Sequence, residues 1–187
     1  MSISRLIYLL LIFIASWSAY YLYEQSGDDF EQAIPSLEAP MFTGEHLYNT
    51  SYDETGLRNY KMYSESLEHF AQDGHTVFHS PKLIIYREGE IEEWIITADD
   101  AVLSKDHILT LQNNVLGRNV LEGASFERLT TEKMQINLDS KDFETDTQVT
   151  MTGPQFTNIG NAMKGNFETN LATLFDQVQG TYEKLTP

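Results

Sequence analysis

Apolar and polar residues alternate along most of the chain beyond Gly56. In the segment KLIIYR, Leu83 and Ile85 share one face, and in the segment EEWIITA, Trp94 and Ile96 do. Successive side chains of a β-strand point to opposite faces, so a period of two indicates strands with one buried face. The pattern therefore predicts β-structure rather than helices for this part of the chain.

The same period recurs further along the chain. It aligns Leu109 with Leu111, and Met134 with Ile136, and it assigns the ambiguous segment 60–70 to a strand as well. Turn signals separate the runs: Asp73-Gly74, Glu88-Gly89, 104–106, Glu122-Gly123, 139–141, Gly153-Pro154 and 158–161. Short strands spaced by such turns are typical of an all-β sandwich, jellyroll or open barrel.

The N-terminus follows another pattern. Residues 6–23 are 18 residues without a charge, enough as a helix to cross about 27 Å of hydrocarbon. Arg5 precedes the segment, so residues 1–23 are predicted to be an anchor with a cytoplasmic N-terminus and the remainder of the chain on the far side. A cleavable signal peptide, with its site among residues 15–19, is the alternative.

Residues 24–55 are acidic and interrupted by glycine and proline, without a sustained period. They are predicted to be a linker between the anchor and a β-domain at 56–187. The chain has 12 Lys and Arg against 28 Asp and Glu, a net charge of −16 that argues against nucleic acid as a partner. It contains no cysteine, which excludes disulfides, thiolate nucleophiles and sulfur-ligated metals.

Candidate chemistry is sparse. His69, His75 and His79 are close in sequence, but their spacing on strands does not place all three on one face, so no metal site is expected. Asp99 and Asp100, with the acidic segment 88–93, invite comparison with the carboxylate pair of glycosidases. Consecutive acids on a strand point to opposite faces, so Asp99 and Asp100 are not expected to form such a pair. The sequence predicts no catalytic residues and no cofactor.

Three segments, LTTEKMQINL, VTMTGPQF and MKGNFETNLATL, resemble the LptC family, and the resemblance covers residues 46–184. LptC is the bitopic inner-membrane component of the bacterial lipopolysaccharide transport bridge. The resemblance implies an open antiparallel β-jellyroll of the OstA/LptA-like type after one transmembrane helix. It also implies a non-enzymatic protein that accepts lipopolysaccharide from an inner-membrane ABC transporter and passes it to a soluble periplasmic bridge protein for delivery to the outer membrane.

Such a protein carries the lipid A acyl chains in an apolar groove. Alternation nominates these residues for the groove: Phe78, Leu83, Ile85, Trp94, Ile96, Leu109, Leu111, Met134, Ile136, Met151, Phe156, Met163, Phe167, Ala172, Leu174 and Tyr182. An ordinary dry core requires the same alternation, so the pattern alone does not separate the two.

The resemblance also implies that the ends of the sheet dock other chains through unpaired backbone groups. The strand near Tyr60, Met62 and Leu67 is expected to bind the periplasmic domains of LptF/LptG-like permease subunits. The strand that includes Ala172 and ends at Tyr182 is expected to bind an LptA-like bridge protein. Val178 and Gly153 are further docking candidates, Gly153 because it lies where a strand meets a turn.

One alternative function remains open from the sequence. A membrane-anchored periplasmic domain of jelly-roll type that binds or hydrolyses carbohydrate has the same pattern of strands. Binding of lipopolysaccharide without turnover favours the transport protein, whereas product formation from a sugar polymer favours the alternative.

Overall fold

The computed structural model describes residues 17, 39–124 and 126–182. The chain divides into two compact units, Met1–Ala39 and Pro40–Pro187, and all strands of the described residues lie in the second. No helix among the described residues is long and apolar enough to span a membrane. The predicted anchor, apart from Trp17, lies outside the described residues.

The second unit is an antiparallel β-structure. Its strands are β1 (Phe42–Tyr52), β2 (Arg58–Phe70), β3 (His75–His79), β4 (Lys82–Arg87), β5 (Ile91–Thr97), β6 (Asp100–Leu103), β7 (Ile108–Asn119), β8 (Arg128–Asn137), β9 (Asp142–Thr145), β10 (Val149–Gly153), β11 (Phe156–Gly160), β12 (Ala162–Asn166), β13 (Leu171–Phe175) and β14 (Gln179–Tyr182). The all-β, antiparallel prediction is confirmed, including the strand assignment of residues 60–70.

Four long strands bend and pass through two layers. The pairing of β1 with β2 is interrupted at His46 and Glu65, and that of β7 with β8 between Gln112 and Val115. Asn113 and Asn114 at this second bend have φ of 62° and 52°, a region that Asn tolerates better than most residues. Each long strand thus contributes one half to each layer.

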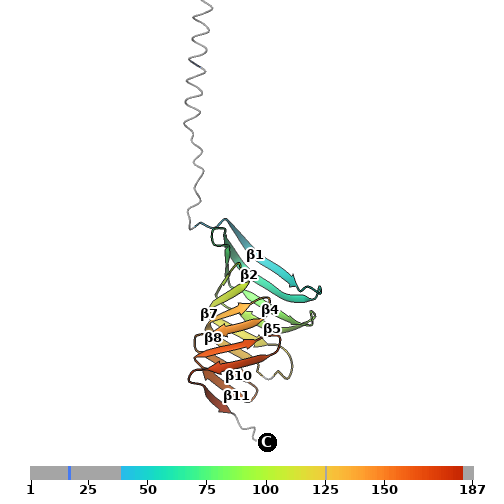
Figure 1. The fold of residues 1–187 in the computed structure, drawn as a ribbon, viewed down its shortest axis with the longest axis vertical. Coiled ribbons are helices and arrows are strands. Elements are labelled where there is room, and N and C mark those ends of the chain that lie inside the picture. Colours follow the sequence, from blue (N-terminus) through green and yellow to red (C-terminus); the bar gives the residue numbers. More distant parts are fainter. Residues whose placement is uncertain (1–16, 18–38, 125, 183–187) are drawn as a thin grey trace, which may run out of the picture. The chain divides into compact units, whose positions relative to one another are not determined.

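Layer 1 contains β4, β5, β10, β11 and β14, with the halves of β1, β2, β7 and β8 that pair with them. Layer 2 contains β3, β6, β9, β12 and β13, with the other halves of the same strands. Figure 1 shows β1 and β2 at one end of this domain and β10 and β11 towards the other.

The turn between β4 and β5 follows from its sequence. Glu88 and Gly89 both have positive φ, 53° and 75°, as the central residues of a type I′ hairpin turn require. A Cβ on Gly89 would lie 2.9 Å from the Cβ of Leu57, so glycine also permits the neighbouring β1–β2 turn to pack closely. The turn predicted at residues 158–161 is too long, because β11 continues to Gly160 and only Asn161 forms the bend before β12.

The predicted linker is wrong over residues 42–52, which form β1, and the folded unit begins at Pro40. Its segment, FTGEHLYNTSY, shows no alternation because most of its side chains are exposed on both faces. As a result β2 is not a free edge: Met62 lies between Asn49 and Leu83, and the strand pairs on both sides.

Candidate functional site: an apolar interior between two layers

The side chains that face inward from the two layers form one apolar interior. In layer 1 strand register aligns Met62, Leu83, Ile96, Gly117, Leu129 and Met151 in one row. In layer 2 it aligns Leu67, Phe78, Ala101, Leu111 and Met134. These residues belong to, or pack against, a single hydrophobic cluster except for Gly117, which has no side chain.

Most of the predicted groove residues lie in this interior. Those that are buried are Phe78, Leu83, Ile85, Trp94, Ile96, Leu109, Leu111, Met134, Ile136, Met151, Met163 and Phe167. Phe156, Ala172 and Leu174 are partly buried and pack against the cluster. Tyr182 is 74% exposed at the end of β14, so its assignment to the interior is wrong in the isolated domain.

Sequence reasoning did not assign Phe126, Leu129 and Phe143 to the interior, where all three are buried. Leu129 and Phe143 have no apolar residue two positions away on either side, so no period of two marks them. Phe126 and Phe167 flank Trp94, each with its ring centroid 5.1 Å from that of the indole. The largest buried side chain of the interior is therefore held between aromatic rings of other segments.

Side chains of the interior are almost fully buried, and Leu83, Leu111 and Met134 are 0% exposed. Where Ile85 of layer 1 and Ile136 of layer 2 meet, beside Asn59 and Leu138, lies a cavity of about 10 Å³, barely the volume that one water molecule needs. An acyl chain can therefore enter the interior at this side only if the two layers move apart or their side chains rearrange.

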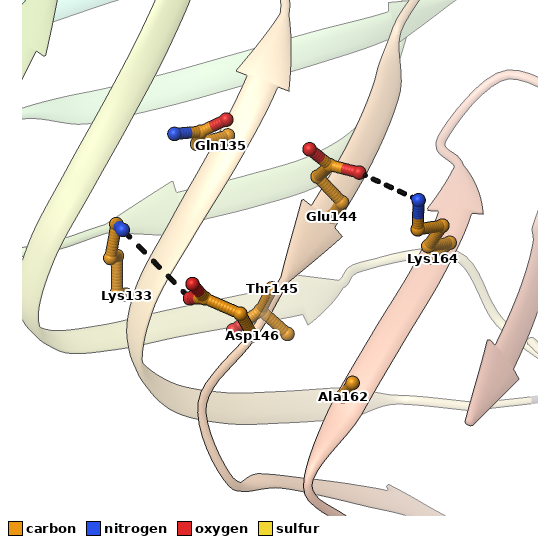
Figure 2. A pocket seen from close by; sticks show the side chains of 7 residues that line it. All are labelled: Lys133, Gln135, Glu144, Thr145, Asp146, Ala162 and Lys164. Atoms are coloured by element: carbon orange, nitrogen blue, oxygen red, sulfur yellow. Dashed lines mark ion pairs between the residues drawn. The ribbon is translucent and has the colours of Figure 1, made fainter. Parts of the chain in front are cut away.

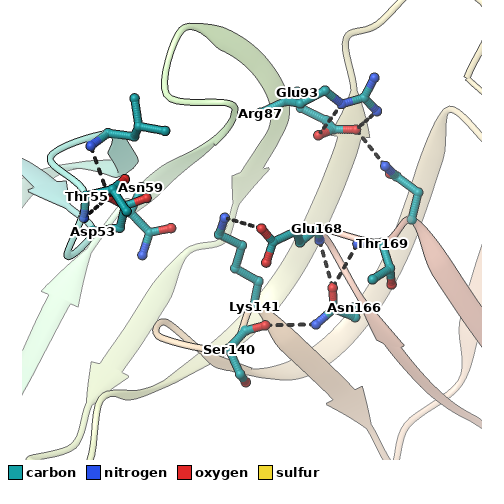
Figure 3. Close-up of polar contacts among 12 residues, drawn as sticks. Asp53, Thr55, Asn59, Arg87, Glu93, Ser140, Lys141, Asn166, Glu168 and Thr169 are labelled. Carbon is teal, nitrogen blue, oxygen red and sulfur yellow. Dashed lines mark hydrogen bonds and ion pairs between the residues drawn. The ribbon is translucent and has the colours of Figure 1, made fainter.

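Polar contacts join the layers on the side opposite the bends. Asn170, in the β12–β13 turn of layer 2, donates from Nδ2 to Glu93 Oε1 at 2.7 Å and accepts from Trp94 Nε1 at 3.1 Å. Glu93 is only 2% exposed and accepts from Arg87 Nε at 3.1 Å (Figure 3). The hydrogen bonds from Arg87 to Glu93 raise the pKa of Arg87. We call Glu93, Asn170 and Arg87 the interlayer latch.

Neighbouring contacts position the latch. Asn166 Oδ1 accepts from the backbone N–H groups of Glu168 and Thr169, both at 2.9 Å, which orders the β12–β13 turn (Figure 3). Along the same side, Asn59 Nδ2 of β2 donates to the Leu138 carbonyl at 3.3 Å. The Asn166 bonds support the turn that carries Asn170, and the Asn59 bond connects the two layers directly.

One end of the domain is a free edge formed by β1. Within the described residues β1 pairs only with β2, and it exposes Phe42, Tyr48 and Tyr52. This edge replaces the one predicted at Tyr60, Met62 and Leu67, since all three residues pair on both sides.

The other end has two free edges. Among the described strands β13 pairs only with β12 and β14 only with β11, so Ala172 and Tyr182 lie on edge strands. The single last strand predicted from Ala172 to Tyr182 is wrong, because residues 176–178 separate β13 from β14. Val178 lies between these strands and is 52% exposed. Gly153 ends β10 as expected, but β10 pairs with both β8 and β11, so it is not an edge.

The residues considered for other chemistry have separate partners. His69 Nδ1 contacts Thr76 Oγ1, the His75 ring stacks on Phe70, and His79 Nδ1 contacts Asp100 at 2.7 Å. Asp99 accepts from Asn114 instead, so the two adjacent carboxylates have different partners. No group of three His, Asp or Glu within the described part of the chain is arranged to hold a metal ion.

Two lysines line a hollow of about 340 Å³ on the surface of layer 2, and each forms an ion pair. Lys164 Nζ lies 3.1 Å from Glu144, and Lys133 Nζ lies 3.8 Å from Asp146 (Figure 2). The positive and negative charges offset one another, so this hollow has no net preference for an ion of either sign.

The domain is thus an antiparallel jellyroll with an apolar interior and free edges at both ends. The same fold is found in LptH of Pseudomonas aeruginosa, described as the LptA homologous periplasmic component of the lipopolysaccharide transport device. The TM-score is 0.54 at 9% identity, covering 67% of this chain and 95% of LptH. Residues 8–183 match the family described as "Lipopolysaccharide-assembly, LptC-related", and the chain belongs to this family.

Relatives named lipopolysaccharide export system protein LptC support this membership. The chain is 28% identical over 190 residues to that of Haemophilus influenzae, covering 92% of this chain and 91% of the relative. It is 28% identical over 156 residues to that of Escherichia coli K12, covering 83% and 82%.

Proposed function

We propose that the protein relays lipopolysaccharide without catalysing a reaction. It accepts the lipid from an inner-membrane ABC transporter, carries the acyl chains between its two layers and passes them to an LptA-like periplasmic bridge protein. The observation that carries this proposal is the apolar interior that runs across the strands of both layers between the free edges. Apolar side chains without reactive groups bind acyl chains and release them again.

The free edges suit a chain of stacked domains. An edge strand presents unpaired backbone groups that another strand can pair with, which continues the sheet and its interior into the next protein. We assign β1 to the LptF/LptG-like permease domains and the β13 and β14 edges to the bridge protein. The exposed Phe42 and Tyr48 at one end, and Leu171 and Phe175 at the other, add apolar surface to each contact.

The N-terminal segment completes the proposal. Residues 1–23 anchor the protein in the inner membrane with a cytoplasmic N-terminus, and residues 24–39 form an acidic linker to the periplasmic domain. The absence of charge over residues 6–23 supports the anchor.

Photo-crosslinking tests the relay. A photoreactive residue at position 78 faces the interior, whereas one at position 77 faces outward on the same strand, because Phe78 is 4% exposed and its neighbour alternates with it. In the complex reconstituted with the transporter, we expect lipopolysaccharide crosslinks at position 78 that require ATP hydrolysis, and only background at position 77. Equal crosslinking at both positions, or crosslinks at 78 without ATP, would contradict directed passage through the interior.

Charge on the β13 edge is expected to block the bridge contact. Leu171 and Phe175 are 69% and 41% exposed, so Leu171→Glu with Phe175→Glu leaves the interior intact. Binding to the LptA-like partner, measured by titration, should weaken roughly tenfold or more because the partner strand would have to bury two carboxylates. Phe42→Glu with Tyr52→Glu, both exposed on β1 at the opposite end of the domain, is the matched control and should bind the LptA-like partner normally.

A further inference from the structure

Two rows on the outer face of layer 1 carry cations and no carboxylate, although the chain is acidic. Strand register aligns two outward rows that cross this layer from β1 to β14. One row contains Lys61, Arg118 and Arg128, and the other contains Lys82. All other positions in the two rows are Thr, Tyr, Ile, Leu or Gln. With 28 acidic against 12 basic residues in the chain, two rows without any carboxylate stand apart from the remaining surface.

Two of these cations lie directly opposite each other. Arg118 of β7 is the register partner of Arg128 of β8, and both are exposed. Like charges at such a position destabilise a sheet. Within the described part of the chain neither guanidinium forms an ion pair or a side-chain hydrogen bond. The pair therefore retains its full capacity to bind an anion, and guanidinium groups match the oxygens of phosphate in two-pronged contacts.

A polar hollow of about 460 Å³ adjoins this pair. Arg128, Thr130, Thr150 and Gln148 line it, so a guanidinium lies beside hydroxyl and amide groups of the kind that bind sugar hydroxyls. Glu132 also lines the hollow, at the bend of β8, and its carboxylate would repel a phosphate. The hollow thus favours phosphate near Arg128 and uncharged sugar towards Glu132.

The lysines of the two rows rest on aromatic rings. Lys61 Nζ lies 5.8 Å from the ring centroid of Tyr48 and 5.6 Å from that of Tyr86, and Lys82 Nζ lies 5.9 Å from that of Tyr63. A hydrogen bond to Tyr86, ahead of one to Tyr48, raises the pKa of Lys61. Ring faces stabilise these cations without neutralising them, so they extend the positive face towards β1.

The outer face of layer 2 differs. Its corresponding row contains Glu68, Glu144 and Lys164, and the last two form an ion pair. A headgroup that carries negative charge is therefore attracted to the outer face of layer 1 rather than to that of layer 2.

We propose that the outer face of layer 1, centred on Arg118 and Arg128, binds the phosphate groups on the sugar headgroup of the transported lipid. The proposal rests on the proposed function, because acyl chains held between the layers leave the headgroup outside. Phosphate contacts on one layer fix the orientation in which the lipid is carried. They also distinguish a phosphorylated glycolipid from other amphiphiles with similar acyl chains.

The test compares bisphosphorylated lipid A with the same lipid after enzymatic removal of its phosphates, using the full chain in detergent micelles. The wild-type protein should bind the phosphorylated form about tenfold more tightly. Arg118→Gln with Arg128→Gln should remove most of this preference and leave binding of the dephosphorylated form unchanged. Added salt should reduce the wild-type preference, because exposed charges are screened.

The control removes two positive charges elsewhere, by Lys105→Gln on the β6–β7 turn with Lys164→Gln on layer 2, and should keep the preference. An unchanged preference in the arginine variant overturns the headgroup proposal. Equal binding of both lipids by the wild type also overturns it, but leaves the relay function standing. Binding of neither lipid overturns the relay as well. The protein is also tested on phosphatidylglycerol vesicles. If it binds them as strongly as lipid A, and if this binding depends on the two arginines, the headgroup proposal is overturned, because the face would then bind the membrane surface.

Discussion

Replacing Trp94 by alanine is expected to destabilise the β-domain by about 4 kcal/mol, the middle of the range for removing a fully buried large aromatic side chain. Trp94 is 0% exposed and lies between Phe126 and Phe167, so the substitution leaves a cavity in the interior. It also removes the donor that bonds to Asn170. Urea unfolding of the full chain in detergent, followed by circular dichroism, measures the free energy of unfolding.

Trp94→Phe separates packing from hydrogen bonding. Phenylalanine retains an aromatic ring but leaves Asn170 Oδ1 without the indole N–H, so a smaller loss of about 2 kcal/mol is expected. A loss below about 1 kcal/mol for Trp94→Ala would contradict a tightly packed interior. It would show that the layers collapse onto the vacated space at little cost, and that the interior adapts readily even without lipid.

The alternation of apolar residues was sufficient to predict the strands with one buried face. Leu109 and Leu111 lie in a strand and alternate with less buried neighbours, as the period of two requires. Leu83 and Ile85 also lie in a strand and are buried, but Ile84 and Tyr86 of the same strand are buried too, which the alternation did not predict. β1 was not predicted, because alternation marks only strands that bury one face. A strand at a free edge has little surface to bury, so no period marks it.

The division into two layers had no signal in the sequence. A long run such as ILTLQNNVLGRN predicts one strand, but Asn113 and Asn114 adopt left-handed conformations that bend it from one layer into the other. Asparagine tolerates this conformation without requiring it, so the bend depends on which strands pair with each half. The register of β7 with β6 and with β5 supplies that information.

The latch shows a further limit of the sequence. Glu93 belongs to an acidic run that reads as ordinary exposed surface, yet its carboxylate is 2% exposed and bound by Asn170 and Arg87. These partners come from residues 77 positions later and 6 positions earlier in the chain. Only the folded structure identifies the contacts that keep the interior closed.

Tying the layers together is expected to abolish lipid loading. Asn59→Cys with Asp139→Cys places two thiols where β2 of layer 1 contacts the end of β8 in layer 2, since Asn59 bonds to the carbonyl of Leu138 and the next residue, Asp139, is exposed. The chain has no other cysteine. A short bis-maleimide crosslinker then prevents the layers from separating on that side. Because the filled interior has a cavity of only about 10 Å³ there, we expect loss of nearly all lipopolysaccharide crosslinking at position 78.

The matched control ties two strands of the same layer. Glu144→Cys with Lys164→Cys joins register partners of β9 and β12, so the same reagent leaves the layers free to part and loading should persist. A long, flexible crosslinker between positions 59 and 139 should restore loading, since it permits the separation that the short one prevents. Normal loading with the short crosslinker in place would mean that acyl chains enter without separation of the layers at this side. The free edges at β1 and β14 would then be the remaining points of entry into the interior.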